Sequence, residues 1–494
     1  MEAIVGISHG KVRGSVRDGV AAFLGIPYAE PPFGAHRFAA PQPVQPWDGI
    51  RDALEYGPTA PKPGYVPPFS ELLPDPQIPG GDCLNLNVWT PEAEGSGLPV
   101  LVWIHGGAFR NGSGAVPLYN GANFARDGVV CVTINYRLGV EGFAHLPGAP
   151  SNRGLLDQIA ALTWVQENIA AFGGDPGNVT VFGESAGAMS VTTLLSLDLS
   201  RERGLFRRAI SQSGAGEIAQ DPGDALLVTK ELAWRLGVEP TAEAFATLDP
   251  ATIIPIQAAV AAEITALPDP VRWGRTTASS GMAMMPILDG ELLTRRPVDA
   301  ITAGAGSDVD LLIGYTSEEF RLFLVPTGVA KVVNADIAVA VLNGLGMDPA
   351  LAAAYQATIP GGALGDALCA VITDGMFRVP AHRVAERHAA APTYMYEFAW
   401  RTPERDMGAC HALEIGFVFD NLHRPEGSAL AGPNPPQDLA TAMHRAWIDF
   451  ATHGDPGWTR FDPETRPVKV FDGTADEIVL DPHAAERELW PRVP

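Results

Sequence analysis

Short apolar runs that alternate with helical patterns constrain the fold of this chain more than any other feature. The runs are rich in branched residues and end near Gly, Pro or Asn, which is typical of strands buried on both faces of a sheet. They cover residues 98–104, 129–135, 179–182, 309–313 and 393–398. Between them, residues 154–172 repeat apolar side chains at intervals of three or four, as an amphipathic helix does. The alternation predicts an α/β fold with a central, mostly parallel sheet covered by helices.

The organisation of the chain favours one domain over residues 1–494. No internal repeat, low-complexity block or long charge run interrupts the sequence. Segment 221–295 is rich in alanine and helical in pattern, and the strand pattern resumes at residue 309. We therefore expect segment 221–295 to form a helical cap inserted over the sheet.

The charge of the chain argues against two classes of partner. It carries 57 acidic and 34 basic residues, a net charge of -23 that repels phosphate backbones and anionic lipid. The first residues hold charges where a signal peptide needs an apolar stretch, and no window reaches the ~18 apolar residues of a spanning helix. The four cysteines show no CxxC spacing. We expect a cytoplasmic protein with reduced thiols and with neither nucleic-acid nor membrane partners.

The motif Gly183-Glu184-Ser185-Ala186-Gly187 follows a predicted strand and precedes a helix-compatible segment. In this setting G-x-S-x-G is typical of a nucleophile elbow, a strained turn that raises the serine hydroxyl above the sheet. The Ala186 amide, the first of the helix, would then face a developing oxyanion. An ordinary glycine-containing turn is the alternative.

A second motif, His105-Gly106-Gly107-Ala108-Phe109, follows the strand predicted at 98–104. A glycine pair after a strand lets backbone N–H groups approach a substrate carbonyl, which favours an oxyanion hole over a simple sharp turn. We expect His105 to hold this loop by hydrogen bonding rather than to transfer protons.

These motifs, together with five further stretches, resemble the type-B carboxylesterases, the carboxylesterase and cholinesterase group of the α/β-hydrolase fold. The similarity extends over nearly the whole chain. The matching stretches are FLGIPYAEPPFGAHRF (23–38), DCLNLNVWTP (82–91), WIHGGAF (103–109), NYRLGVEGF (135–143), residues 152–187, ACHALEIGFVF (409–419) and WIDFATHGDP (447–456).

The resemblance implies a catalytic triad of Ser185, Glu319 and His411, in the chain order of the fold. His411 matches the family's catalytic histidine, whereas His444 is expected to be structural. Two adjacent carboxylates, Glu318 and Glu319, follow the strand predicted at 309–313. The family's spacing from the glycine that ends the strand selects Glu319, with Glu318 as the alternative.

Further roles also come from the resemblance. It implies an oxyanion hole made by the amides of Gly107, Ala108 and Ala186, with alanine at 108 where many relatives have a third glycine. Glu184 and Ser213 match positions directly behind the triad in the family, where they either contribute to catalysis or only form hydrogen-bonded turns behind the active site.

The sequence also offers candidates for other roles near the site. Phe109, Phe320 and Phe398 are possible lining residues of the substrate pocket. Cys410, next to His411, is expected to be buried packing. Cys83 matches a cysteine that secreted relatives pair with an earlier one, and no cysteine precedes it here.

The implied activity is hydrolysis of small-molecule carboxylic esters through an acyl-enzyme, with no metal or organic cofactor. A specialised detoxifying esterase, or an acyltransferase that uses an alcohol in place of water, would use the same residues. A non-catalytic adhesion relative is a further alternative, but such relatives lose the serine or the histidine of the triad.

Overall fold

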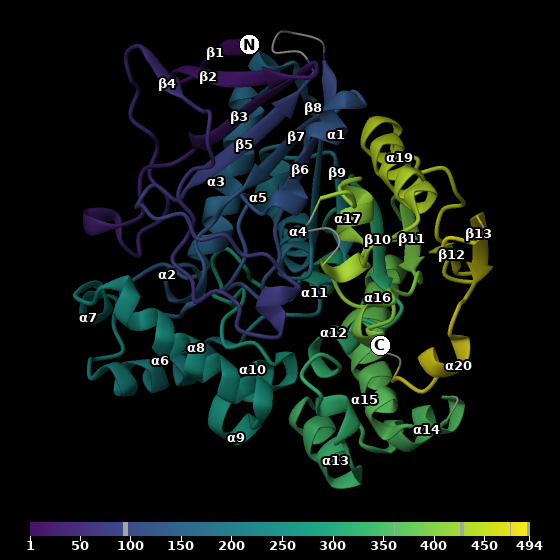
Figure 1. Cartoon of the computed structure of the whole chain (residues 1–494). Helices are drawn as coiled ribbons and strands as arrows, with labels where there is room; N and C mark the ends of the chain where they lie inside the picture. The colour runs from purple at the N-terminus through teal and green to yellow at the C-terminus, as the bar shows by residue number, and fades with distance from the viewer. Residues whose placement is uncertain (92–96, 360, 389, 425–428, 475, 492–494) are drawn as a thin grey trace.

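A single large β-sheet organises the computed structural model, which describes residues 1–91, 97–359, 361–388, 390–424, 429–474 and 476–491. Within these residues the sheet has 13 strands in the order β1-β2-β3-β5-β7-β6-β8-β9-β10-β11-β12-β13, with β4 beside β2 (Figure 1). The strands are β1 (Glu2–Ile7), β2 (Gly10–Arg17), β3 (Val20–Pro27), β4 (Ile50–Asp52), β5 (Asn85–Thr90), β6 (Leu98–Ile104), β7 (Val130–Ile134), β8 (Gly174–Glu184), β9 (Arg208–Gln212), β10 (Asp310–Thr316), β11 (Thr393–Phe398), β12 (Pro467–Phe471) and β13 (Asp476–Leu480).

The centre of the sheet is parallel, as the sequence predicts, but its ends are not. Neighbouring strands from β7 through β6, β8, β9, β10 and β11 to β12 are parallel. The amino-terminal strands β1, β2, β3 and β5 and the last strand β13 pair antiparallel. Short turns join β1 to β2 and β2 to β3, and such turns allow only antiparallel pairing. The sequence analysis did not identify these edge strands.

Alternation of side chains along the central strands explains why both faces of the sheet are buried. On β6, Val100, Val102 and Ile104 pack into one hydrophobic cluster, whereas Leu101 and Trp103 pack into the other. Successive side chains of a strand point to opposite faces, so a continuous apolar run fills two cores.

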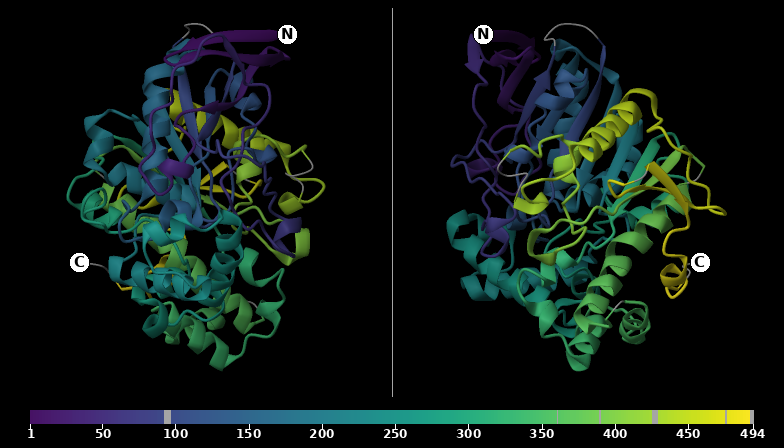
Figure 2. Two further views of the ribbon diagram at one scale, coloured as in Figure 1. Left: turned by 90° about the vertical axis from the view of Figure 1, so that its left-hand side faces the viewer. Right: turned by 45° about the vertical axis from the view of Figure 1, so that its right-hand side comes forward.

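Helices cover both faces (Figures 1 and 2). Side chains of α3, α4 and α16 join the first cluster, and those of α1, α17 and α19 join the second. The helices are α1 (Ala122–Arg126), α2 (Gly139–Phe143), α3 (Arg153–Asn168), α4 (Ala186–Ser196), α5 (Asp198–Glu202), α6 (Pro222–Leu236), α7 (Ala242–Ala246), α8 (Pro250–Ala266), α9 (Pro270–Trp273), α10 (Arg275–Ser280), α11 (Pro297–Thr302), α12 (Arg321–Leu324), α13 (Ala335–Gly344), α14 (Ala350–Thr358), α15 (Leu364–Thr373), α16 (Val379–His388), α17 (Ile415–Val418), α19 (Gln437–His453) and α20 (Ala484–Arg487).

Two groups of helices interrupt the strand order. Helices α6 to α10 follow β9 and occupy most of the segment expected to form a cap. Helices α12 to α16 lie between β10 and β11 and form the green group at the lower right of Figure 1. The sequence pattern did not predict this second group, although a π-helical segment at Asp374–Arg378 joins α15 and α16 into one continuous helix. In the described residues, no helix has both the length and the apolar character needed to cross a bilayer.

The parallel strands bring the sequence motifs together. His105 follows β6, Ser185 follows β8, and Glu319 lies shortly after β10. The carboxyl ends of parallel strands share one edge of a sheet, so these residues gather there.

Candidate active site

The turn between β8 and α4 holds Ser185 in a strained backbone conformation. Its φ of 56° and ψ of −124° are unfavourable for a residue with a side chain. Its N–H donates to the carbonyl of Gln212 at 2.9 Å. A Cβ at Gly187 would lie 2.0 Å from the Ile104 carbonyl oxygen, and one at Gly183 would lie 2.7 Å from the carbonyl carbon of Gly187. The two glycines therefore let α4 pass close to the sheet.

His411 is held by Glu319. Oε2 of Glu319 accepts a hydrogen bond from Nδ1 of His411 at 2.6 Å, and its Oε1 accepts from the Thr316 N–H at 2.7 Å. The His411 N–H donates to the Glu319 carbonyl at 3.2 Å. Glu319 is fully buried. These contacts fix the imidazole ring and stabilise its charged form.

Glu318 points elsewhere. Its Oε2 accepts from the Ala409 N–H at 2.9 Å and lies 2.5 Å from Arg401, and its Oε1 lies 3.7 Å from Arg321. Of the two adjacent carboxylates, Glu319 is the one that contacts His411.

Ser185 and His411 line the same cavity. Within the described residues the Ser185 hydroxyl has no hydrogen-bond partner, and Nε2 of His411 lies 3.0 Å from Oε1 of Glu184 instead. Burial lowers the pKa of His411, but the carboxylates of Glu184 and Glu319 outweigh burial and hold this pKa well above its ordinary value. Contacts between a nucleophile and its base often tighten only when substrate binds.

A buried chain of polar groups lies behind Ser185 and was missed by the sequence analysis. Oε1 of Glu414 accepts from Nε2 of Gln212 at 3.1 Å, and Oε1 of Gln212 accepts from Nε1 of Trp447 at 3.0 Å. Burial, with Glu184 and Glu319 nearby, raises the pKa of Glu414 to about 8. These hydrogen bonds fix the side chain of Gln212, whose backbone carbonyl accepts the hydrogen bond from the Ser185 N–H.

Three backbone amides near Ser185 lack acceptors. Among the described residues, the N–H groups of Gly107, Ala108 and Ala186 have no hydrogen-bond acceptor. Gly107 and Ala108 line the cavity with φ values of 113° and 53°, and Ala186 is the first residue of α4. Unpaired amides are rare in folded proteins, so a cluster of them indicates a site for a ligand oxygen.

His105 packs against the loop that follows it, which favours the expected role of holding this loop. Its ring stacks on Tyr136 at 4.5 Å, and its Nδ1 lies 2.8 Å from the Gly106 carbonyl. Burial lowers the pKa of His105 to about 4. A Cβ at Gly112 would lie 2.5 Å from Nδ1, so this ring packs directly on the loop.

The other candidates near Ser185 and His411 are buried. Ser213 has a φ of 55°, donates its N–H to the Gly314 carbonyl at 2.9 Å, and is fully buried. Cys410 lies in the second hydrophobic cluster, where burial raises the pKa of its thiol. His444 lies on α19, and its Nδ1 is 2.7 Å from the Val418 carbonyl oxygen. Cys410 is therefore buried packing, as expected, and His444 is not among the residues that line the cavity.

None of the three aromatic residues suggested for the pocket lines the cavity in the described structure. Phe109 packs on Phe143 with ring centroids 4.7 Å apart, and Phe398 packs on Phe417 at 5.1 Å. Phe320 packs among the helices that follow β10. Phe109 and Phe320 lie beside site residues in sequence, but all three rings pack into hydrophobic clusters.

The cavity has a volume of about 180 Å³ and a mainly apolar wall. Part of that wall comes from residues 65–74, a segment with one short 3-10 turn at Phe69–Glu71 and no periodic pattern that would mark it in the sequence. The lining residues are Tyr65, Phe69, Leu72, Leu73, Pro74, Gly106, Gly107, Ala108, Arg110, Gly112, Val116, Leu118, Tyr119, Glu184, Ser185, Leu322, Phe323, His411, Ala412, Leu413, Ile415, Gly416 and Leu430.

No group of three or more His, Cys, Asp or Glu side chains in the described residues could hold a metal ion.

Known proteins of one family are similar to this chain over nearly its whole length. A family model described as the carboxylesterase family matches residues 1–485. The chain is 37% identical to para-nitrobenzyl esterase of Bacillus subtilis (strain 168), covering 99% of this chain and 98% of that protein. It is 35% identical to phenmedipham hydrolase of Pseudarthrobacter oxydans, covering 96% and 95%. The crystal structure of the Geobacillus stearothermophilus carboxylesterase EST55 at pH 6.2 superposes with a TM-score of 0.86 at 36% identity, covering 99% of this chain and 100% of that one.

Proposed function

The chain belongs to the carboxylesterase family, a family of serine ester hydrolases, and on that premise we propose that Ser185, His411 and Glu319 carry out its chemistry. The observation that carries the proposal is the Glu319–His411 hydrogen bond of 2.6 Å in the cavity that Ser185 lines. The carboxylate orients the imidazole, and in the proposal neutral His411 exchanges its contact with Glu184 for one with the serine, so that Nε2 accepts the hydroxyl proton.

The first step forms an acyl-enzyme. Oγ of Ser185 attacks the ester carbonyl while Nε2 of His411 takes the hydroxyl proton. The amides of Gly107, Ala108 and Ala186 hold the oxyanion of the tetrahedral intermediate. The C–O bond to the alcohol then breaks, and His411 gives its proton to the departing alkoxide.

The second step regenerates the serine. His411 takes a proton from water, and the resulting hydroxide attacks the acyl carbonyl in the same oxyanion hole. The bond to Oγ breaks, Ser185 recovers the proton from His411, and the carboxylic acid leaves.

Covalent labelling tests the assignment of the nucleophile. An organophosphonate probe is expected to label the wild type and Ser279→Ala, a matched change at an exposed serine of α10, and to leave Ser185→Ala unlabelled. Ser185→Ala is also expected to lose ester turnover while it keeps its circular dichroism spectrum. Labelling of folded Ser185→Ala would contradict the assignment. Absence of labelling in the wild type would favour a non-catalytic relative.

The substrates remain small-molecule esters in this proposal. Para-nitrobenzyl esters are the first to test, because the Bacillus subtilis relative bears that name. Water is the proposed acyl acceptor. Product analysis with added alcohol distinguishes hydrolysis from acyl transfer, which the same residues would support.

We also propose a single domain for residues 1–494, with α6 to α10 as its cap, and a cytoplasmic location. The one sheet that runs from β1 to β13 supports the first proposal. The second is supported by all four cysteines being buried and free of disulfides.

A further inference from the structure

Arg110 is a feature of the cavity that the proposed hydrolysis does not use. It lines the cavity with Ser185 and His411, and its N–H donates to the Gly107 carbonyl at 3.1 Å, within the proposed oxyanion loop. In the described part of the chain its guanidinium has neither a hydrogen-bond nor an ion-pair partner. Burial lowers the pKa of Arg110, and an arginine nevertheless stays charged. A partly buried charge without a counter-charge costs free energy. An anionic group bound beside Arg110 would reduce that cost.

The other arginines with largely buried side chains do have partners. Arg153 donates to backbone carbonyls, including those of Glu141, Val140 and Ala144. The remaining pairs are Arg37 with Glu141, Arg137 with Asp157, Arg208 with Asp310, Arg321 with Asp366, and Arg378 with Asp374. Arg110 departs from this pattern in the cavity that Ser185 and His411 line.

Tyr65 supplies a second polar group beside Arg110. It lines the same cavity, and its hydroxyl has no hydrogen-bond partner within the described residues. The two groups are close enough that each affects the pKa of the other. A guanidinium and a phenol hydroxyl together offer several N–H and O–H donors and suit the paired oxygens of a carboxylate.

The cavity wall keeps these two groups in place. Lys62 forms a buried ion pair with Asp75 and donates to the Gly112 carbonyl at 2.9 Å. Asp75 also accepts from Nδ2 of Asn111 at 2.9 Å. The segment that carries Tyr65 is therefore tied to the loop that carries Arg110.

We propose that Arg110, assisted by Tyr65, binds a carboxylate group on the substrate, so that the preferred esters are anionic. This proposal rests on the proposed function, because it places the carboxylate in the cavity where Ser185 attacks. The carboxylate can belong to the acyl part, as in a half-ester of a dicarboxylic acid, or to the alcohol part, as in an acylated hydroxy acid.

Matched pairs of esters test the preference and its source. Monoethyl adipate and its neutral amide, ethyl adipamate, test the acyl part. The acetyl esters of 4-hydroxybenzoate and 4-hydroxybenzamide test the alcohol part. The wild type is expected to show a higher kcat/KM for the carboxylate than for the amide in one of the two pairs, by about 10- to 100-fold, as for a hydrogen bond to a charged group.

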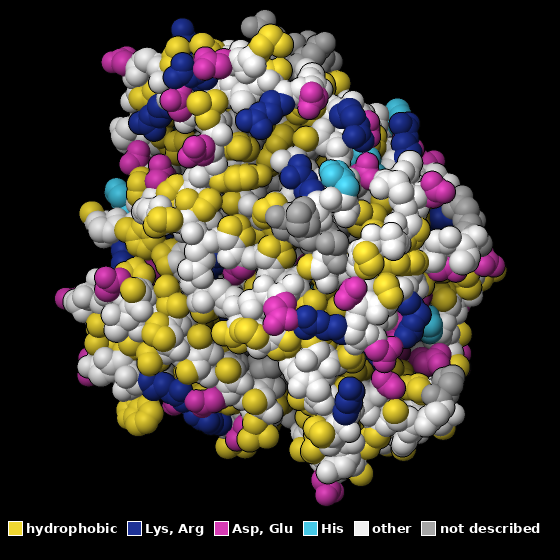
Figure 3. Space-filling model, viewed as in Figure 1, with side chains coloured by type: hydrophobic (Ala, Val, Ile, Leu, Met, Phe, Trp, Pro, Cys, Tyr) yellow, Lys and Arg dark blue, Asp and Glu magenta, His cyan; other side chains and the backbone are white. Residues whose placement is uncertain are grey.

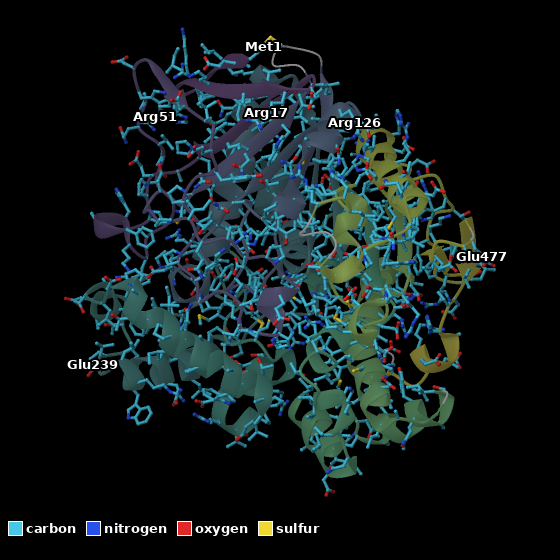
Figure 4. All side chains as sticks on the ribbon, in the orientation of Figure 1. Met1, Arg17, Arg51, Arg126, Glu239 and Glu477 are labelled. Carbon is cyan, nitrogen blue, oxygen red and sulfur yellow. The ribbon has the colours of Figure 1, made fainter. Side chains whose placement is uncertain are left out.

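Variants then assign the preference to Arg110. Arg110→Gln is expected to lower kcat/KM for the carboxylate ester and thereby to remove most of the preference over the amide. Arg110→Lys should keep part of that preference. Tyr65→Phe should lower the ratio with the arginine intact. The control is Arg17→Gln, which removes one positive charge from an exposed residue of β2 at the far edge of the sheet (Figure 4) and should leave the ratio unchanged.

Two results would overturn the proposal: no preference for the carboxylate in either pair, or an equal loss on the carboxylate and the amide in both Arg110→Gln and Tyr65→Phe. The second result would assign Arg110 a structural role in the loop. If the wild type hydrolyses none of the four esters and no neutral aryl ester, the proposed function fails instead, so the two failures are distinguishable.

Discussion

At the scale of single residues, two neighbouring glutamates after β10 have different environments. Glu319 is fully buried and bonded to His411, whereas Glu318 contacts Ala409, Arg401 and Arg321. Glu319→Gln is expected to lower kcat/KM for a neutral aryl ester by about 10³- to 10⁴-fold, because an amide neither orients nor stabilises the imidazolium in the same way. Steady-state kinetics on folded protein measures the loss.

Glu318→Gln is the matched control, since its amide oxygen can still accept from the Ala409 N–H. It should keep kcat/KM within about tenfold of the wild type, as expected for a group that does not touch the reacting atoms. A larger loss in Glu318→Gln than in Glu319→Gln would reverse the assignment.

Glu184 gives a pH-dependent prediction. His411 must be neutral to accept a proton, so kcat/KM rises as pH passes upward through the pKa of His411. Glu184 raises that pKa, and Glu184→Gln therefore moves the acid limb of the profile to lower pH. Glu318→Gln should leave the limb in place, because Glu318 contacts Arg401 and Arg321 rather than His411. An acid limb unmoved by Glu184→Gln, or moved upward, would contradict the account.

The sequence predicts the residues of the site better than its walls. Ser185 is marked by the glycines of its turn, because they meet a need of the local backbone, whereas Glu319 is selected over Glu318 by the spacing that the family resemblance implies, counted from Gly314. The lining residues do not follow from local geometry. Phe109 and Phe320 lie next to site residues in sequence, yet Tyr65 and Phe323 line the cavity, because loop packing decides which side chains face it.

At the scale of elements, the turn between β8 and α4 depends on how closely the helix approaches β6. A Cβ at Gly187 would lie 2.0 Å from the backbone oxygen of Ile104, which cannot rotate away. Gly187→Ala is expected to lower the free energy of unfolding by about 1–3 kcal/mol and to reduce kcat/KM, even though alanine favours helices. Denaturant unfolding and steady-state kinetics measure the two effects.

Gly6→Ala serves as the control, because a Cβ on this residue of β1 meets nothing within 4 Å. It should change stability by less than about 0.5 kcal/mol, as is usual at open surface sites. A Gly187→Ala variant as stable and active as Gly6→Ala would show that the close approach is not required.

The elements that the sequence predicts are those buried on both faces. The strand predictions at 98–104 and 393–398 coincide with β6 and β11. A short, continuous apolar run with turn residues at its ends is typical of a strand buried on both faces. Strand β1 is largely exposed and carries no such run. Helices α13 and α14 are short and their tertiary contacts are among themselves and their neighbours, so their sequence carries only a weak periodic signal.

At the scale of the whole molecule, the face shown in Figure 3 carries its charges distributed rather than concentrated. Acidic and basic side chains are interspersed over the face shown in Figure 3. The net charge of -23 therefore acts as a general property that favours solubility, while the recognition proposed at Arg110 is local and short-range.

Burial of every cysteine also gives a prediction for the whole molecule. Burial raises the pKa of Cys369 to about 12 and raises the pKa of the other three thiols as well. The thiolate is the reactive form, so the folded enzyme is expected to keep its activity in iodoacetamide at neutral pH. Thiol titration should find four reactive groups only after denaturation. Rapid, stoichiometric modification of the folded protein would contradict this expectation.

The central claim is that the acyl group passes through Ser185, and acid quenching of the enzyme during turnover tests it most directly. Digestion and mass spectrometry of the quenched protein are expected to find one acyl group per chain, on the peptide that contains Ser185, with an equivalent burst of released alcohol. An acyl group on any other residue, or the same adduct in Ser185→Ala, would contradict the account.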